Sequence, residues 1–112
     1  MEFTELRAGK VVVVVPNGRI DAATAVEFQK KLLAIIGDQP IRLALDCTEI
    51  KYISSIGLRA LIVAAKKVAA VRGRLVVCAV PRHVQQIFDL AGIATVIPIL
   101  GTRQEAIDAI AQ

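Results

Sequence analysis

Two adjacent serines, Ser54 and Ser55, are the side chains of this sequence whose types and spacing best fit surface chemistry. A serine hydroxyl can cap a helix, attack a substrate when a base activates it, or accept a phosphoryl group. The single histidine, His83, falls in a different predicted helix, and nothing in its spacing brings it to a serine as a base. We therefore expect a surface or packing role for His83.

The two cysteines, Cys47 and Cys78, lie in apolar, strand-like segments without the spacing of metal ligands. Buried thiols are the expected outcome, ahead of a disulfide or a redox pair. The sequence also has no Gly-rich phosphate loop, and we expect no cofactor and no catalytic residues.

The serines must be positioned by a helix, because apolar residues recur after them at intervals of three and four. This pattern predicts a helix over residues 55–72 that ends at Gly73, with apolar side chains at Leu58, Leu61, Ile62, Ala65, Val68 and Ala69. Serine is favoured at such a start, because its oxygen accepts a bond from a first-turn N–H group.

Two residues near this start conflict with helix rules. Gly57 costs roughly 1 kcal/mol relative to Ala in a helix, and Arg59 places a cation near the positive end of the helix dipole. Such conflicts favour a functional site. A glycine there lets another backbone or a partner surface come close.

The rest of the chain predicts alternating strands and helices. Residues 3–7 and 11–15 form a predicted hairpin, and Pro16, Asn17 and Gly18 form a turn that ends the second strand. Thr24 and Glu27 fit a capping box that opens a helix reaching Gly37, with Val26, Leu33 and Ile36 on its apolar side. Further strands are predicted over residues 41–46, 74–80 and 95–99, and helices over residues 81–90 and from about residue 101.

This order predicts one α/β domain over residues 1–112: a mixed, mostly parallel sheet with an N-terminal β-hairpin and about four helices packed on it. Asp21 precedes the first helix, and we weigh a capping or turn role for it against a functional one.

Composition narrows the functional classes. Hydrophobic residues make up 55% of the sequence and charged residues 21%, which favours a folded domain. The net charge is +4, but basic residues are scattered and aromatics are few, so we expect no direct nucleic-acid binding. No apolar run would span a bilayer and no signal peptide is visible, so we expect a cytoplasmic protein.

The segment Ser54-Ser55-Ile56-Gly57-Leu58-Arg59 resembles the STAS domain family, in particular the bacterial anti-sigma factor antagonists. The resemblance covers essentially the whole chain. It includes Gly18-Arg19-Ile20-Asp21 with Thr24, the Val76-Val77-Cys78 strand and the segment Phe88-Asp89-Leu90-Ala91-Gly92-Ile93.

The resemblance implies a non-enzymatic, phosphorylation-controlled switch. The unphosphorylated domain would bind an anti-sigma factor that is itself a serine kinase, and so release a sigma factor to regulate transcription. A metal-dependent serine phosphatase would reverse the modification. The family's phospho-acceptor maps onto Ser55, with Ser54 as the alternative, and its acidic position maps onto Asp21.

The expected partner surface combines these residues with the outer side of the helix. We expect a monomer or weak dimer, and the expected partner-binding residues are Asp21, Thr24, Ser54, Ile56, Gly57, Arg59, Ala60 and Val63. Two other functions remain open: a STAS scaffold or regulatory subunit without a phosphorylation cycle, and an enzyme, which the lack of a Ser/His/Asp arrangement disfavours.

Overall fold

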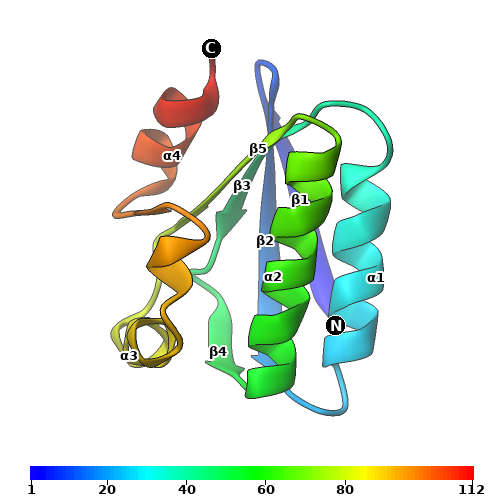
Figure 1. Cartoon of the computed structure of the whole chain (residues 1–112). Coiled ribbons are helices and arrows are strands. Elements are labelled where there is room, and N and C mark those ends of the chain that lie inside the picture. The colour runs from blue at the N-terminus through cyan, green and yellow to red at the C-terminus, as the bar shows by residue number, and fades with distance from the viewer.

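A mixed six-stranded sheet organises the structure, a computed structural model that describes residues 1–112 (Figure 1). The spatial order is β1-β2-β3-β5-β6, and β4 pairs with the far end of β2. The β1–β2 pair is antiparallel and all other pairs are parallel. The strands are β1 (Glu2–Ala8), β2 (Val11–Ile20), β3 (Arg42–Asp46), β4 (Ile50–Ile53), β5 (Arg74–Cys78) and β6 (Ile99–Leu100).

The five valines that begin β2 are buried on both faces of the sheet, as the sequence predicts. Val12 and Val14 belong to the main core, which α1 (Ala25–Ile36) and α2 (Ser55–Ala70) cover. Val11, Val13 and Val15 belong to a second apolar cluster under α4 (Arg103–Ile110). Figure 1 shows α1 and α2 side by side on one face and α4 on the other. The predicted α/β architecture is confirmed.

The predicted turn at Pro16, Asn17 and Gly18 is wrong, because β2 continues through it to Ile20. The strand changes partner there: Val11 to Val14 pair with β3, whereas Gly18 to Ile20 pair with β4. A register shift falls between Gly18 and Arg19, and Gly18 has φ of 115°. The turn-forming residues therefore make an irregularity inside a strand.

The predicted last strand exists, but its predicted bounds, residues 95–99, are wrong. Gly92 ends α3 (Arg82–Ala91) in a left-handed conformation, and a short 3-10 helix, η1 (Ile93–Thr95), follows. The Thr95 hydroxyl donates to the Gly92 carbonyl at 2.7 Å, which holds this turn closed. The strand β6 begins only at Ile99.

One buried charge ties α4 to the sheet. Asp46 ends β3 and is the only charged residue in the buried set. Its carboxylate accepts bonds from the Thr48 amide at 2.9 Å and from Arg103 Nε at 2.7 Å. Burial raises the pKa of Asp46, but hydrogen bonds from the Thr48 hydroxyl, the Thr48 amide and Arg103 outweigh that effect and leave its pKa below the ordinary value.

The cysteines lie in the core and the histidine lies at the surface. Cys47 and Cys78 are both buried and free, as predicted. His83 is exposed, and its Nε2 lies 2.7 Å from the carbonyl oxygen of Lys51. None of the helices combines the length and the apolar character needed to cross a bilayer, and no cluster of three or more His, Cys, Asp or Glu side chains could hold a metal ion.

Candidate functional site

The start of α2 is fixed by a hydrogen bond to β2 and by a serine cap. The Ser54 amide donates to the Ile20 carbonyl at 2.8 Å, which joins the chain after β4 to the end of β2. Ser54 itself is extended, and its Oγ accepts a bond from the Gly57 amide at 3.2 Å. This geometry confirms the predicted helix start and gives Ser54 a capping role.

Ser55 is the first residue of α2, and its side chain is exposed. In the first turn of an α-helix the backbone N–H groups have no intrahelical acceptor. The Gly57 amide is satisfied by Ser54, so the amides of Ser55 and Ile56 remain for solvent or a ligand. No histidine or carboxylate is hydrogen-bonded to either serine, so the site lacks the base that a serine nucleophile requires.

Gly57 is buried, and its role is internal packing. A β-carbon at this position would lie 2.7 Å from Ile20 Cγ2, 2.7 Å from Ile53 Cγ1 and 3.1 Å from the Ile20 carbonyl oxygen. The first turn of α2 therefore sits directly on the ends of β2 and β4. The expectation that Gly57 contacts a partner is wrong, because its own chain covers it.

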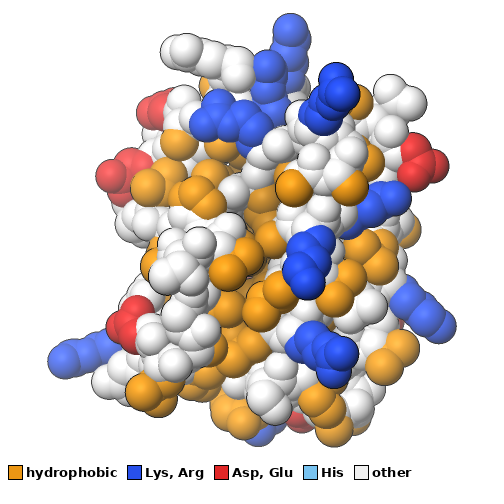
Figure 2. All heavy atoms as spheres, in the orientation of Figure 1, with side chains coloured by type: hydrophobic (Ala, Val, Ile, Leu, Met, Phe, Trp, Pro, Cys, Tyr) orange, Lys and Arg blue, Asp and Glu red, His pale blue; other side chains and the backbone are white.

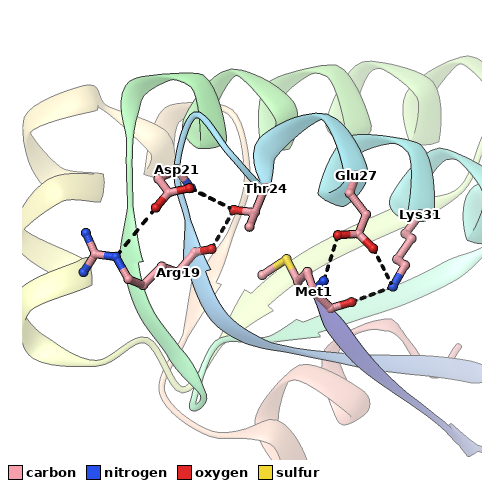
Figure 3. A network of polar contacts seen from close by, with 6 residues as sticks. All are labelled: Met1, Arg19, Asp21, Thr24, Glu27 and Lys31. Atoms are coloured by element: carbon pink, nitrogen blue, oxygen red, sulfur yellow. Dashed lines mark hydrogen bonds and ion pairs between the residues drawn. The ribbon is translucent and has the colours of Figure 1, made fainter.

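Asp21 lies in the loop between β2 and α1, with its carboxylate turned towards its own loop (Figure 3). Its Oδ1 accepts a bond from the Ala23 amide at 3.0 Å, and its Oδ2 lies 3.7 Å from Arg19 Nε. The Thr24 hydroxyl donates to the Arg19 carbonyl at 2.6 Å and accepts from the Asp21 amide at 3.0 Å. Both side chains thus shape the turn, and Asp21 remains half-buried at the end of the molecule that carries Ser55.

The predicted capping box at Thr24 and Glu27 does not form. The Thr24 hydroxyl is engaged by the preceding loop, and Glu27 instead pairs with the terminal amine of Met1 at 2.7 Å and with Lys31 at 3.3 Å (Figure 3). Val26 is also 63% exposed, so its place on the apolar side of α1 is wrong. The buried residues of this helix are Ala25, Phe28, Leu32 and Ile36.

A shallow apolar depression lies beside Ser55, and we call it the Ser55 groove. Its volume is about 370 Å³, and α3 forms one wall. Leu90 on α3 is 91% exposed, which is unusual for a large apolar side chain, and Ile56 beside Ser55 is 50% exposed. The groove is lined by Tyr52, Ile53, Ser55, Leu58, Ile87, Leu90 and Ala91.

The expected partner residues divide by exposure. Ile56 and Arg59 are exposed, and Asp21, Thr24, Ser54 and Val63 are partly buried. Ala60 is 1% exposed and, like Gly57, cannot reach a partner. It belongs to the core because it lies on the side of α2 that faces the sheet. Arg59 forms no ion pair, so its charge remains available at the surface.

None of the partner-binding residues expected from the sequence lies on α3. A helix turns about 100° per residue, so Leu90 lies about 200° from the buried Phe88 and on the outer side of α3. An apolar residue in that position is a signal in the sequence. What the sequence does not show is that α3 packs near β4 and so comes beside Ser55.

Comparison with known proteins identifies the family. The sequence profile of the STAS domain matches residues 5–106. The chain belongs to the STAS domain family. One relative is BtrV of Bordetella bronchiseptica, described by its name as a candidate anti-sigma factor antagonist, which is 29% identical over 106 residues covering 95% of this chain and 91% of BtrV.

Solved structures of STAS proteins share the fold. An anti-sigma factor antagonist from Mycobacterium paratuberculosis superposes with a TM-score of 0.89 at 24% identity, covering 99% of this chain and 94% of that one. The phosphorylated form of SpoIIAA, a Bacillus cell fate determinant, superposes with a TM-score of 0.68 at 18% identity, covering 97% and 99%. The STAS fold of this chain therefore agrees with its family.

Proposed function

We propose that this STAS domain is an anti-sigma factor antagonist controlled by phosphorylation of Ser55. The observation that carries the proposal is the position of Ser55: an exposed hydroxyl on the first residue of a helix, beside an apolar groove. The names of the relatives supply the partner class, an anti-sigma factor. The domain acts by binding and catalyses no reaction of its own.

A phosphate on Ser55 is compatible with the fold. It would lie at the N-terminus of α2, where unpaired amides and the helix dipole favour an anion. The Ser54 cap and its bond to Ile20 do not involve the Ser55 hydroxyl, so they need not break. A SpoIIAA structure exists in a phosphorylated form with the same fold, which supports this part of the proposal.

The same phosphate is incompatible with a tight interface. It adds a charge of about −1.5 to −2 at neutral pH, at the edge of a groove formed mainly by apolar side chains. Burying that charge without a counter-charge costs several kcal/mol. Since about 1.4 kcal/mol changes affinity tenfold, we expect at least a hundredfold loss of partner affinity.

The proposed partner is an anti-sigma factor with serine kinase activity. Its apolar side chains would fill the Ser55 groove against Leu90 and Ile56, and Arg59 would pair with a carboxylate at the rim. A metal-dependent serine phosphatase would restore binding. All three proteins would meet in the cytoplasm, where the released sigma factor acts.

The first step of the test determines which serine accepts the phosphate. The cognate anti-sigma kinase and ATP are mixed with the wild type, Ser55→Ala and Ser54→Ala, and intact mass is measured. One phosphate is expected on the wild type and on Ser54→Ala, and none on Ser55→Ala. Because Ser54 caps α2, Ser54→Ala should also lose about 1 kcal/mol of stability, which separates its role from that of Ser55.

The second step measures partner affinity by calorimetry. Ser55→Ala should bind as the wild type does, whereas Ser55→Asp and Leu90→Ser should bind far more weakly. Leu6→Ser is the matched control, since Leu6 is an exposed leucine on β1, away from the groove. Equal binding by Ser55→Ala and Ser55→Asp would refute the switch and favour a scaffold without a phosphorylation cycle.

A further inference from the structure

The outer edge of β1 is unpaired. β1 is the outermost strand of the sheet, and its inner edge pairs with β2 from Glu2 to Ala8. β2 is the one element in extensive contact with it, and the residues from Thr4 to Arg7 are exposed. Figure 1 shows β1 at the side of the sheet away from β5. A free strand edge presents N–H and C=O groups that can pair with another strand.

The β1 edge lacks the features that usually prevent such pairing. Proteins protect an edge strand with a proline, a lysine, a bulge or a very short length. β1 has seven residues, none of them proline or lysine, and its register with β2 is continuous. The opposite edge of the sheet is different, because β6 has two residues. Of these two edges, β1 is the one long enough to accept another strand.

The backbone groups that face outwards belong to alternate residues of β1. Antiparallel partners alternate between hydrogen-bonded and non-hydrogen-bonded pairs, and the pair that flanks the two-residue turn at residues 9–10 is a hydrogen-bonded one. Phe3 then falls in a non-hydrogen-bonded pair, and its partner Pro16 has no N–H group to donate. By the same alternation, the N–H and C=O groups of Glu5 and Arg7 point away from β2.

A second copy of β1 matches this edge in charge. Two identical antiparallel strands are related by a two-fold axis perpendicular to the sheet, so residues on the same face of the sheet come opposite each other. With Leu6 on the axis, Glu5 of each copy lies opposite Arg7 of the other, and Glu2 lies opposite Lys10 at the turn. None of these four charged side chains forms an ion pair within its own chain. The two Leu6 side chains, each 40% exposed, would cover each other.

Other registers match the charges less well. With Glu5 on the axis, the two Glu5 side chains lie opposite each other, and with Arg7 on the axis two arginines do. Like charges directly opposite repel. With Thr4 on the axis, Glu5 lies opposite Phe3 and gains no cation. The register centred on Leu6 is therefore the favoured one.

The surroundings of Arg7 explain why its own chain does not neutralise it. Arg42, Arg72 and Arg74 lie around the same concavity at the hairpin end of the molecule, and Glu5 is the one acidic residue there. Figure 2 shows Lys and Arg side chains gathered at this end. A carboxylate for Arg7 has to come from outside the chain, and Glu5 of a second copy supplies one.

We propose that two copies of this chain pair through the outer edges of β1 and form one continuous sheet with Leu6 at the two-fold axis. Because short strands meet, the interface is smaller than the ~1,200–2,000 Å² typical of stable complexes, and the dimer forms reversibly at micromolar concentrations or above. α3, which forms one wall of the Ser55 groove, packs near β4 rather than β1. The pairing therefore leaves both Ser55 grooves open.

The test measures self-association of the full chain by analytical ultracentrifugation, from micromolar to millimolar concentrations. The variants are Glu5→Arg, Arg7→Glu and the double variant that carries both changes. All three alter exposed side chains on an edge strand, so they should fold, and circular dichroism checks this. Glu5→Arg raises the net charge of +4 and Arg7→Glu lowers it, so a general charge effect would change the two single variants in opposite directions.

Each single variant should dimerise about tenfold more weakly or worse, because two attractive pairs become two repulsive ones. The double variant restores opposite charges and should dimerise as the wild type does. In the wild-type dimer, amide exchange at Glu5 and Arg7 should slow as concentration rises. A wild type that stays monomeric throughout, a double variant as weak as the single ones, or unchanged exchange at both amides would overturn the proposal.

Discussion

Replacing Gly57 by alanine tests the packing that positions Ser55. The added β-carbon would lie 2.7 Å from Ile20 Cγ2 and from Ile53 Cγ1, and 3.1 Å from a backbone oxygen. Two of these neighbours are buried branched side chains and the third is main chain, so none can move aside cheaply. Such overpacking lowers the free energy of unfolding by about 1–3 kcal/mol. Alanine has a higher helix propensity than glycine, which raises the free energy of unfolding by up to about 1 kcal/mol.

If alanine gains the full ~1 kcal/mol, these two terms leave a loss of about 0–2 kcal/mol in the free energy of unfolding. The two contacts at 2.7 Å are closer than a β-carbon normally approaches, so we expect the upper half of that range, about 1–2 kcal/mol. Urea unfolding followed by circular dichroism measures it. Gly101→Ala is the matched control, because its β-carbon would meet only the flexible end of Glu105, at 3.0 Å, and its stability should change by less than about 0.5 kcal/mol. A Gly57→Ala protein as stable as the wild type would refute the close-packing argument.

Two further predictions concern buried ionisable groups. The pKa of Asp46 is lower folded than unfolded, so its stabilisation is present above about pH 4 and is lost as pH falls through the folded value. Asp46→Asn should therefore lower the free energy of unfolding by about 1.5–3 kcal/mol at pH 7 and by much less at pH 2. An equal loss at both pH values would contradict a stabilising role for the ionised Asp46 carboxylate. Burial raises the pKa of Cys78 to about 11 and that of Cys47 well above its usual value, so a disulfide reagent should label both thiols only after unfolding. Labelling of the native protein at pH 7 would contradict this.

Local sequence patterns predict the parts of the fold that local physics decides. The burial of the β2 valines on both faces could be predicted because it depends only on their apolar character. The Ser54 cap of α2 could be predicted because it depends only on neighbouring residues. The sequence also singles out Gly57, although the surface that approaches it is Ile20 of the same chain.

Features that depend on contacts between distant segments cannot be predicted from local sequence patterns. Pro16 and Gly18 predict a turn, but pairing with β1 on one side and β4 on the other keeps the strand extended. Arg103 forms an ion pair with Asp46, which lies 57 residues earlier in the sequence. Leu90 meets the serine site only because α3 packs near β4.

The length of α2 also determines how the two ends of the molecule influence each other. Mobile ions screen charges over about 8 Å at physiological ionic strength, and α2 spans ~22 Å. A dianion on Ser55 would therefore exert almost no field on the arginines beyond the last turn of the helix. The effect of the phosphate would therefore stay local, at the end of the molecule that carries Ser55.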